Sequence, residues 1–130
     1  MTREAKPRAI EIYQGADGNA EFDTWVNEIE PRAAARVTRA VTQLGLGGGD
    51  LKALGEGVSE LRIDYGPGYR VYFGQDGETL VILLCGGTKK RQQKDIDRAK
   101  ALWAEYKARK AEAAADVKPK TKTKKKNKKS

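Results

Sequence analysis

Residues 57–73 read GVSELRIDYGPGYRVYF, and this stretch decides the fold because it has the pattern of a β-hairpin. Apolar and polar residues alternate on both sides of Gly66-Pro67-Gly68, three residues that favour a tight turn. A three-residue connection sets three apolar cross-strand pairs on one face: Tyr65–Tyr69, Ile63–Val71 and Leu61–Phe73. On the other face it sets three further pairs: Arg62–Tyr72, Asp64–Arg70 and Glu60–Gly74. The hairpin is therefore predicted to have one apolar face and one polar face.

The sequence after the hairpin predicts a buried strand followed by a helix. Asp76-Gly77 is typical of a second tight turn, and residues 80–84 are continuously apolar, as in a strand that is buried on both faces. Gly86-Gly87 ends this strand. A charged helix is expected from residue 89 to about residue 109. Its apolar side chains recur at helical spacing: Ile96, Ala99, Trp103 and Tyr106.

The N-terminal half predicts one strand and two helices. Residues 8–13 form the strand, because Ile10 and Ile12 alternate with polar neighbours. A helix beginning near Ala20 has one apolar face: Phe22, Trp25, Val26 and Ile29. Pro31 favours the first turn of a second helix over residues 31–44. Residues 45–57 contain six glycines and are predicted to be a loop.

These elements predict an α+β fold in the order β-α-α-β-β-β-α. The helices are expected to pack on one face of a small, antiparallel-rich sheet. Both tryptophans, Trp25 and Trp103, are expected in the core because they share a helix face with other apolar residues. The size of the domain is sufficient for one modest core.

The formal net charge of +8 is concentrated near the C-terminus. Eight of the 26 lysines and arginines lie in residues 116–130, together with only one of the 18 acidic residues, Asp116. Residues 1–115 are therefore close to neutral. We expect a folded domain over residues 1–112 and a disordered, lysine-rich tail over residues 113–130. The tail is interpreted either as a dispensable extension or as a segment that binds nucleic acid.

The composition excludes several classes of protein. No run of about 18 apolar residues is present, so no membrane span is expected. The N-terminal residues lack the apolar stretch of a signal peptide, so we expect a cytoplasmic protein with no membrane partner. Cys85 is the single cysteine and there is no histidine, which excludes an internal disulfide, a Cys/His zinc site and a histidine-based catalytic triad.

The polar face of the hairpin carries two arginines and a tyrosine, Arg62, Arg70 and Tyr72. One interpretation is structural: Asp64 pairs with Arg70, and Arg62 stacks on Tyr72. The other is functional, because guanidinium groups bind phosphate oxygens and a tyrosine stacks on a base or moves a proton. Lys89-Lys90-Arg91 would border the same surface. Positive charge is unfavourable at the start of a helix, which favours a bound anion there.

Four segments carry a resemblance to a known family: GVSELRIDYGPGYRVYF at 57–73, LLCGGTKKRQQKDIDRAKAL at 83–102, FDTWVNEI at 22–29 and DLKALG at 50–55. Together they resemble the RelE/ParE toxin superfamily, and within it the HigB-like branch of addiction module killer proteins. The resemblance covers about residues 8–105 and leaves out the lysine-rich tail.

The resemblance implies the toxin of a type II toxin–antitoxin pair. Its partner would be a cognate antitoxin, expected to be a helix-turn-helix protein encoded by the neighbouring gene. RelE- and HigB-like members enter the ribosome and cut messenger RNA, which inhibits translation. The RNA 2′-hydroxyl attacks the adjacent phosphate and leaves a 2′,3′-cyclic phosphate. This endoribonuclease chemistry needs no metal and no other cofactor.

The resemblance also implies roles for individual residues. Arg70, in the Gly68-Tyr69-Arg70 motif, matches the clamp on the scissile phosphate. The remaining catalytic candidates are Lys89 and Lys90 after the last strand, Arg62 on the hairpin, and Tyr72, which would replace a tyrosine that RelE-type enzymes carry near the C-terminus and where this chain has Ile96 or a neighbour. The expected RNA-binding residues are Lys52, Tyr69 and Arg91.

A second function is compatible with the same superfamily. ParE-like members inhibit DNA gyrase by binding it and carry out no chemistry. Such a protein does not need the arginine pair for phosphate binding, so the role of Arg62 and Arg70 distinguishes the two functions.

Overall fold

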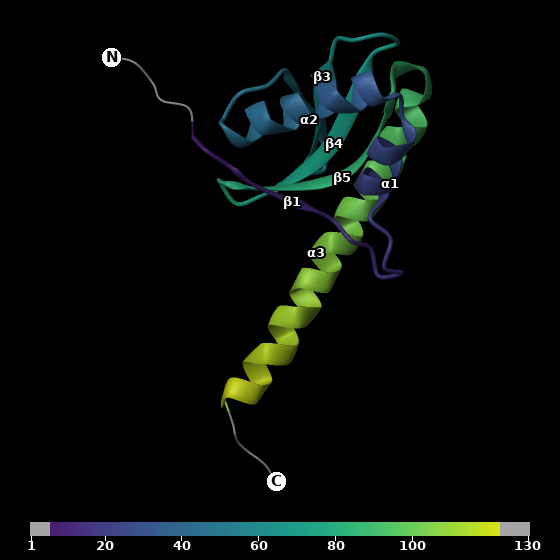
Figure 1. Cartoon of the computed structure of the whole chain (residues 1–130). Helices are drawn as coiled ribbons and strands as arrows, with labels where there is room; N and C mark the ends of the chain where they lie inside the picture. The colour runs from purple at the N-terminus through teal and green to yellow at the C-terminus, as the bar shows by residue number, and fades with distance from the viewer. Residues whose placement is uncertain (1–5, 123–130) are drawn as a thin grey trace, which may run out of the picture.

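The computed structural model describes residues 6–122 of the chain, with side chains through residue 115. Its elements in chain order are β1 (Ala9–Ile12), α1 (Glu21–Glu28), α2 (Pro31–Gly45), β2 (Leu51–Gly55), β3 (Val58–Ile63), β4 (Tyr69–Asp76), β5 (Leu80–Thr88), the 3-10 turn η1 (Lys89–Arg91) and α3 (Gln92–Lys122). The five strands form one mixed sheet in the order β1-β5-β4-β3-β2 (Figure 1). The β1 strand pairs with β5 in parallel, and the other neighbours are antiparallel. The predicted α+β class is confirmed.

The glycine-rich segment contains a strand that the sequence analysis missed. Residues 45–57 were expected to form a loop, but Leu51–Gly55 pairs with β3 as the edge strand β2. Gly55, Glu56 and Gly57 all have positive φ, at 94°, 58° and 85°, and they make the tight connection to β3. The sequence pattern did not indicate this strand, because the glycines before and after it are typical of turns. The observed element order is therefore β-α-α-β-β-β-β-α.

The β3–β4 hairpin has a register two residues away from the predicted one. Five residues connect the strands, since Ile63 lies opposite Tyr69 and the Gly68 N–H donates to the Tyr65 carbonyl at 3.0 Å. All six predicted cross-strand pairs are therefore wrong, including Asp64–Arg70 and Arg62–Tyr72. A shift of two residues leaves every side chain on its predicted face. The face that was expected to be polar is, however, buried in part, because Val58, Glu60 and Tyr72 lie under α3.

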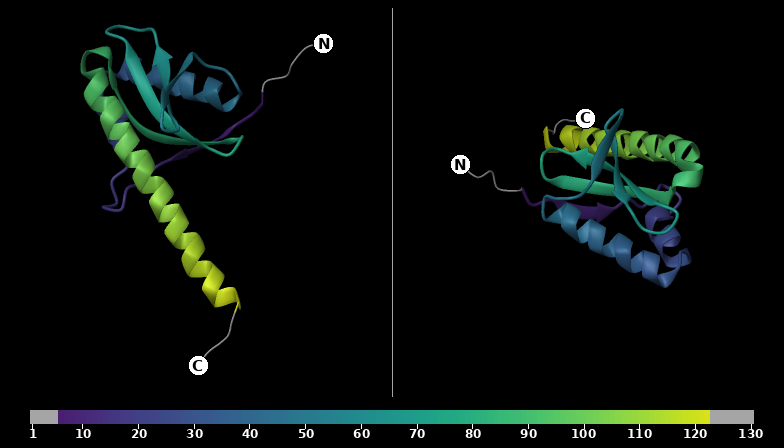
Figure 2. Two further views of the ribbon diagram at one scale, coloured as in Figure 1. Left: turned by 180° about the vertical axis from the view of Figure 1, so that it is seen from behind. Right: turned by 90° about the horizontal axis from the view of Figure 1, so that it is seen from above.

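Helices cover both faces of the sheet, which corrects the prediction that they share one face. Figure 2 shows α1 and α2 on one side and α3 on the other. The first core layer contains Val37 of α2 with Val81 and Leu83 of β5, and the second contains Leu102 of α3 with Ile82 and Leu84. Residues 81–84 of the predicted apolar run are buried on both faces, and Leu80 at its start is only partly buried. The second apolar face of β5 is covered by α3, which therefore lies on the side of the sheet opposite α1 and α2.

Two tryptophans pack directly on glycine backbone from opposite sides of the sheet. The Trp103 ring of α3 lies over Gly74 of β4, and the Trp25 ring of α1 lies over Gly86 of β5. A Cβ atom at either glycine would overlap the indole ring. Core positions for Trp25 and Trp103 are thus confirmed, and the two glycines set how closely α1 and α3 approach the sheet.

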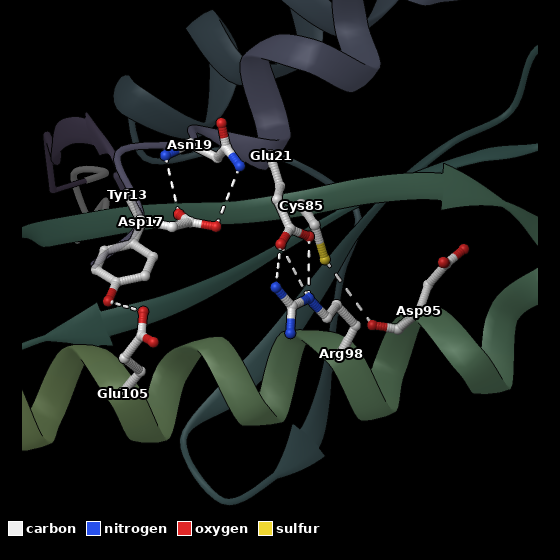
Figure 3. Close-up of polar contacts among 8 residues, drawn as sticks. All are labelled: Tyr13, Asp17, Asn19, Glu21, Cys85, Asp95, Arg98 and Glu105. Atoms are coloured by element: carbon white, nitrogen blue, oxygen red, sulfur yellow. Dashed lines mark hydrogen bonds and ion pairs between the residues drawn. The ribbon is translucent and has the colours of Figure 1, made fainter. Parts of the chain in front are cut away.

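Polar contacts fix the direction of α3 across the sheet (Figure 3). Arg98 pairs with Glu21 of α1, and the Tyr13 hydroxyl donates to Glu105. Farther along the helix, the Lys110 Nζ lies 2.5 Å from the Asp76 carboxylate. These three contacts, spaced along the helix, tie α3 to α1, to the end of β1 and to β4.

The α3 helix continues past the predicted end at residue 109 and projects from the body of the molecule (Figure 1). Residues 113–122, which were expected to be disordered, are helical, and the alanines at 113–115 have a high helix propensity. Residues 123–130 of the predicted tail lie outside the described residues. No helix in the described part of the chain combines the length and apolarity that crossing a bilayer requires.

Asp95 lies in the first turn of α3 against the backbone of Gly87. A side chain at Gly87 would overlap its carboxylate, and one of its two oxygens is buried without a hydrogen-bond partner. Burial raises the pKa of Asp95, and nearby Arg91 only partly opposes this. The carboxylate is therefore held in an environment that favours its neutral form.

Adding a methyl group at the tryptophan contacts is expected to destabilise the protein. Gly74→Ala and Gly86→Ala should each lower the free energy of unfolding by about 1–3 kcal/mol, because the indole ring must move away from the sheet. Gly48→Ala is the matched control, since a Cβ there meets only a carbonyl oxygen at an ordinary 3.6 Å. Urea unfolding of the three variants measures the difference. Equal stability of all three would contradict the packing role of these glycines.

Replacing Asp95 with asparagine is expected to stabilise the protein at neutral pH. The pKa of Asp95 is raised in the folded state, so the folded protein binds a proton at this carboxyl more tightly than the unfolded chain does. The free energy of unfolding therefore falls as the pH rises through the pKa of the folded state. Asp95→Asn removes this loss, so its melting temperature should exceed that of the wild type at neutral pH. The difference should vanish below pH about 4, where the unfolded carboxyl is also protonated. Asp97→Asn, at an exposed position of the same helix, should show no such trend.

Candidate functional site

Two arginines lie directly opposite each other at the end of the β3–β4 hairpin. Arg62 of β3 and Arg70 of β4 are cross-strand partners, so their side chains leave the same face of the sheet. Like charges in this arrangement destabilise a sheet. An arrangement of this kind persists when neighbouring carboxylates offset the repulsion or when the pair binds an anion.

Each arginine has its own carboxylate partner. The Arg62 Nη2 atom lies 2.8 Å from the Asp50 Oδ1 atom at the surface. The Arg70 Nε atom lies 3.6 Å from the Glu60 Oε1 atom, and Glu60 is only 1% exposed. Gln92 of α3 donates to the same Glu60 oxygen at 3.1 Å. The Arg70 guanidinium is thus oriented by a buried carboxylate, which α3 in turn holds in place.

Glu60 is the residue at this site that the sequence analysis did not identify. In the predicted register it lay opposite Gly74 and was expected to face solvent; it lies opposite Tyr72 instead. A buried carboxylate is stable only when it is paired, and removing one partner of such a pair typically costs about 3–5 kcal/mol. The signal available in the sequence was an acidic residue two positions before Arg62, on the same face.

The side chains of the two arginines line a surface depression with a volume of about 300 Å³. Its lining residues are Asp50, Arg62, Ile63, Asp64, Gly68, Arg70 and Lys89. Lys89 is brought there by its backbone, because its N–H donates to the Gly68 carbonyl at 3.0 Å. Gly68 has a φ of 87°, and a side chain at this position would contact both Arg70 and Lys89. Glycine therefore keeps the space between the two cations open.

The other predicted basic residues lie around this depression and do not line it. Lys90 and Arg91 are exposed on η1, next to Lys89 in sequence. Lys52 is exposed on β2 opposite Glu60, so it shares the arginine face one row away. The structure thus brings together Arg62, Arg70 and Lys89 and leaves the remaining cations at the margin.

The two predicted tyrosines are buried in opposite core layers. Tyr72 is 0% exposed beneath α3, and its hydroxyl has no hydrogen-bond partner. Burial, with Glu60 and Asp95 nearby, raises the pKa of Tyr72 far above the ordinary value. Tyr69 is 8% exposed and packs against Trp25 and Tyr65, on the face away from Arg70. In this conformation neither phenol reaches the depression, because helices cover both faces of the strand that carries them.

The chemistry of the depression is that of an anion-binding site. Two guanidinium groups and an ammonium group meet there, and the carboxylates of Asp50 and Asp64 border them. Arginine pairs match the geometry of phosphate oxygens. Cys85 is buried, and burial raises the pKa of its thiol to about 12, so it stays protonated. Among the described residues, no cluster of three or more Asp, Glu, Cys or His side chains is arranged to hold a metal ion.

Two comparisons with known proteins bear on this arrangement. Residues 24–105 match the family described as phage derived protein Gp49-like (DUF891). An uncharacterized protein of Haemophilus influenzae is 47% identical over 83 residues, which are 62% of this chain and 84% of that protein. The family match over residues 24–105 includes both arginines, Glu60 and Lys89. The Gp49-like family is a toxin family of type II toxin–antitoxin systems with the RelE/ParE-like fold, and this chain belongs to it.

Proposed function

We propose that the protein is a HigB-like toxin that cleaves messenger RNA on the ribosome and so inhibits translation. The observation that carries this proposal is the pair Arg62 and Arg70, held side by side at a depression that Lys89 completes. Asp50 and Glu60 offset the repulsion between the two arginines, but Lys89 adds a third cation to the depression. Two guanidinium groups and an ammonium group at one depression support binding of a phosphate group.

In the proposed reaction, the RNA 2′-oxygen attacks the adjacent phosphorus. A bond forms between the 2′-oxygen and phosphorus, the bond from phosphorus to the 5′-oxygen breaks, and the products end in a 2′,3′-cyclic phosphate and a 5′-hydroxyl. One proton leaves the 2′-hydroxyl and one reaches the 5′-oxygen. The ribosome would hold the message with the 2′-oxygen in line, which lowers the entropic part of the barrier.

Arg70 is assigned to the non-bridging oxygens of the scissile phosphate, with Arg62 beside it. A well-placed donor to developing negative charge contributes about 3–4 kcal/mol to catalysis. Glu60 is assigned as a positioning residue, because its buried carboxylate forms an ion pair with the Arg70 guanidinium at 3.6 Å. Lys89, with Lys90 next to it in sequence, is assigned to the charge that develops on the leaving oxygen.

Lys52 and Arg91 are proposed to contact RNA phosphates at the margin of the site. Both are exposed, and Lys52 shares the face of the arginine pair. Tyr69 and Tyr72 contribute through packing in this proposal, since both are buried. The antitoxin that membership of the family implies is expected to be a helix-turn-helix protein encoded next to this gene.

Loss of the phosphate clamp is expected to abolish toxicity. Arg70→Ala should lower the cleavage rate by at least about 10²-fold, because charge on the non-bridging oxygens is no longer stabilised. Growth after induction, with transcript 5′ ends mapped in the same culture, measures the effect. Arg32→Ala is the matched control, since Arg32 is an exposed arginine of α2 outside the depression.

Two results would contradict this proposal. Arrested growth with intact messages would exclude the endonuclease. Loss of DNA supercoiling by gyrase on addition of the purified protein would instead support the ParE-like function. In that case Arg70→Ala should still arrest growth, because binding gyrase does not use the arginine pair for phosphate chemistry.

A further inference from the structure

We propose that the RNA-binding surface continues from the arginine pair onto α2, where Arg36 and Arg39 bind backbone phosphates of single-stranded RNA beside the scissile one. This inference rests on the proposed function and extends it, because it assigns the path of the strand outside the reaction centre. The sequence analysis assigned no RNA-binding residue to α2.

A second surface depression, next to the first, provides this path for the RNA strand. It has a volume of about 200 Å³ and is lined by Arg36, Arg39, Ala40, Gln43, Arg62, Ile63 and Asp64. Three of these residues, Arg62, Ile63 and Asp64, also line the depression at Arg70 and Lys89. The two hollows therefore meet at Arg62, and together they form one continuous surface from Lys89 to α2.

The geometry of the sheet edge makes this continuity possible. The last cross-strand pair between β2 and β3 is Leu51–Leu61, so the residues after Arg62 have no strand beside them on that side. The α2 helix packs under the same part of β3, on the opposite face from Arg62 (Figure 2). Long side chains from α2 can therefore reach the open end of β3 and meet Arg62 there.

The charge along this surface is largely uncompensated. Arg36 and Arg39 are exposed, and neither forms an ion pair with any described carboxylate. Asp64 is the acidic residue that lines both hollows, and Asp50 is already paired with Arg62. Five cations thus lie along the two hollows against three carboxylates, if the buried Glu60 that pairs with Arg70 is counted with Asp50 and Asp64. An excess of positive charge favours the binding of a polyanion.

Arg36 is oriented before any ligand binds. Its guanidinium carbon lies 4.8 Å from the centre of the Tyr65 ring, in a cation–π contact. Tyr65 is in turn stacked on Tyr69 of the core, so the arginine rests on a fixed platform. Arg39 follows one helical turn later on the same side of α2. The two guanidinium groups are therefore spaced along the surface as successive phosphate contacts.

The test is binding of a short single-stranded 2′-O-methyl RNA, which lacks the attacking hydroxyl and is not cleaved. The full-length double variant Arg36→Gln/Arg39→Gln should bind more weakly. Each lost phosphate contact reduces the slope of log K against log salt concentration by about 0.7, so the double variant should lose about 1.4. Arg32→Gln, on the same helix but outside both hollows, is the control and should keep the wild-type slope.

Three outcomes would overturn the inference. The first is a wild-type slope in the double variant. The second is an equal loss of affinity for a double-stranded RNA hairpin, which would point to structured ribosomal RNA. The third is a loss of antitoxin binding with RNA binding unchanged. Arg36→Lys/Arg39→Lys keeps the charges and should keep the slope, which separates phosphate binding from a folding defect.

The inference and the proposed function can fail separately. Cleavage that depends on Arg70, together with unchanged RNA binding in the α2 variant, would overturn only the path over α2. No dependence of cleavage on Arg70 would overturn the proposed function itself, whatever the α2 variant does.

Discussion

The structure depends on two indole rings that rest directly on the backbone of the central strands. Trp25 lies on Gly86 from one side of the sheet, and Trp103 lies on Gly74 from the other. Close packing of this kind leaves little freedom in the distance or angle of the helices. It fixes α3 across one face, and the start of α3 supplies Gln92 to Glu60 and follows Lys89 in the chain. The geometry of the basic depression is thus a consequence of how α3 packs.

The arginine pair is an arrangement in which stability and binding compete. Two adjacent guanidinium groups repel each other, and the protein offsets this with the exposed Asp50 and the buried Glu60. The exposed partner can be displaced at little cost, because surface ion pairs are weak. The buried partner cannot leave, so it acts as a fixed support for Arg70. Arg62 is therefore the more adaptable of the two arginines, which suits its place where the two hollows meet.

Much of the fold could be predicted from local patterns, and the errors have physical causes. The face of each hairpin residue was predicted correctly, because alternation is a property of the strand alone. The register was wrong because the loop spans five residues, including Asp64 and Tyr65, which the pattern assigned to the strands. The β2 strand was missed because its flanking glycines have the composition of a loop. Glu60 was missed because its face was expected to be exposed, whereas α3 covers it, and because the predicted register placed it opposite Gly74 and away from Arg70.

The sequence by itself determined the class of fold, the apolar strand at residues 80–84 and the hairpin face that carries two arginines. It also carried the resemblance to a toxin superfamily, which the match to the Gp49-like family supports. Only the tertiary structure decided which residues meet. It placed Arg62 opposite Arg70, buried Tyr69 and Tyr72, brought Lys89 to Gly68, and joined the hollow at α2 to the arginine pair. The reason is that periodicity reports the direction of a side chain within its own element. Which side chains become neighbours depends on register and on helix placement, and both are set by packing between segments far apart in the chain.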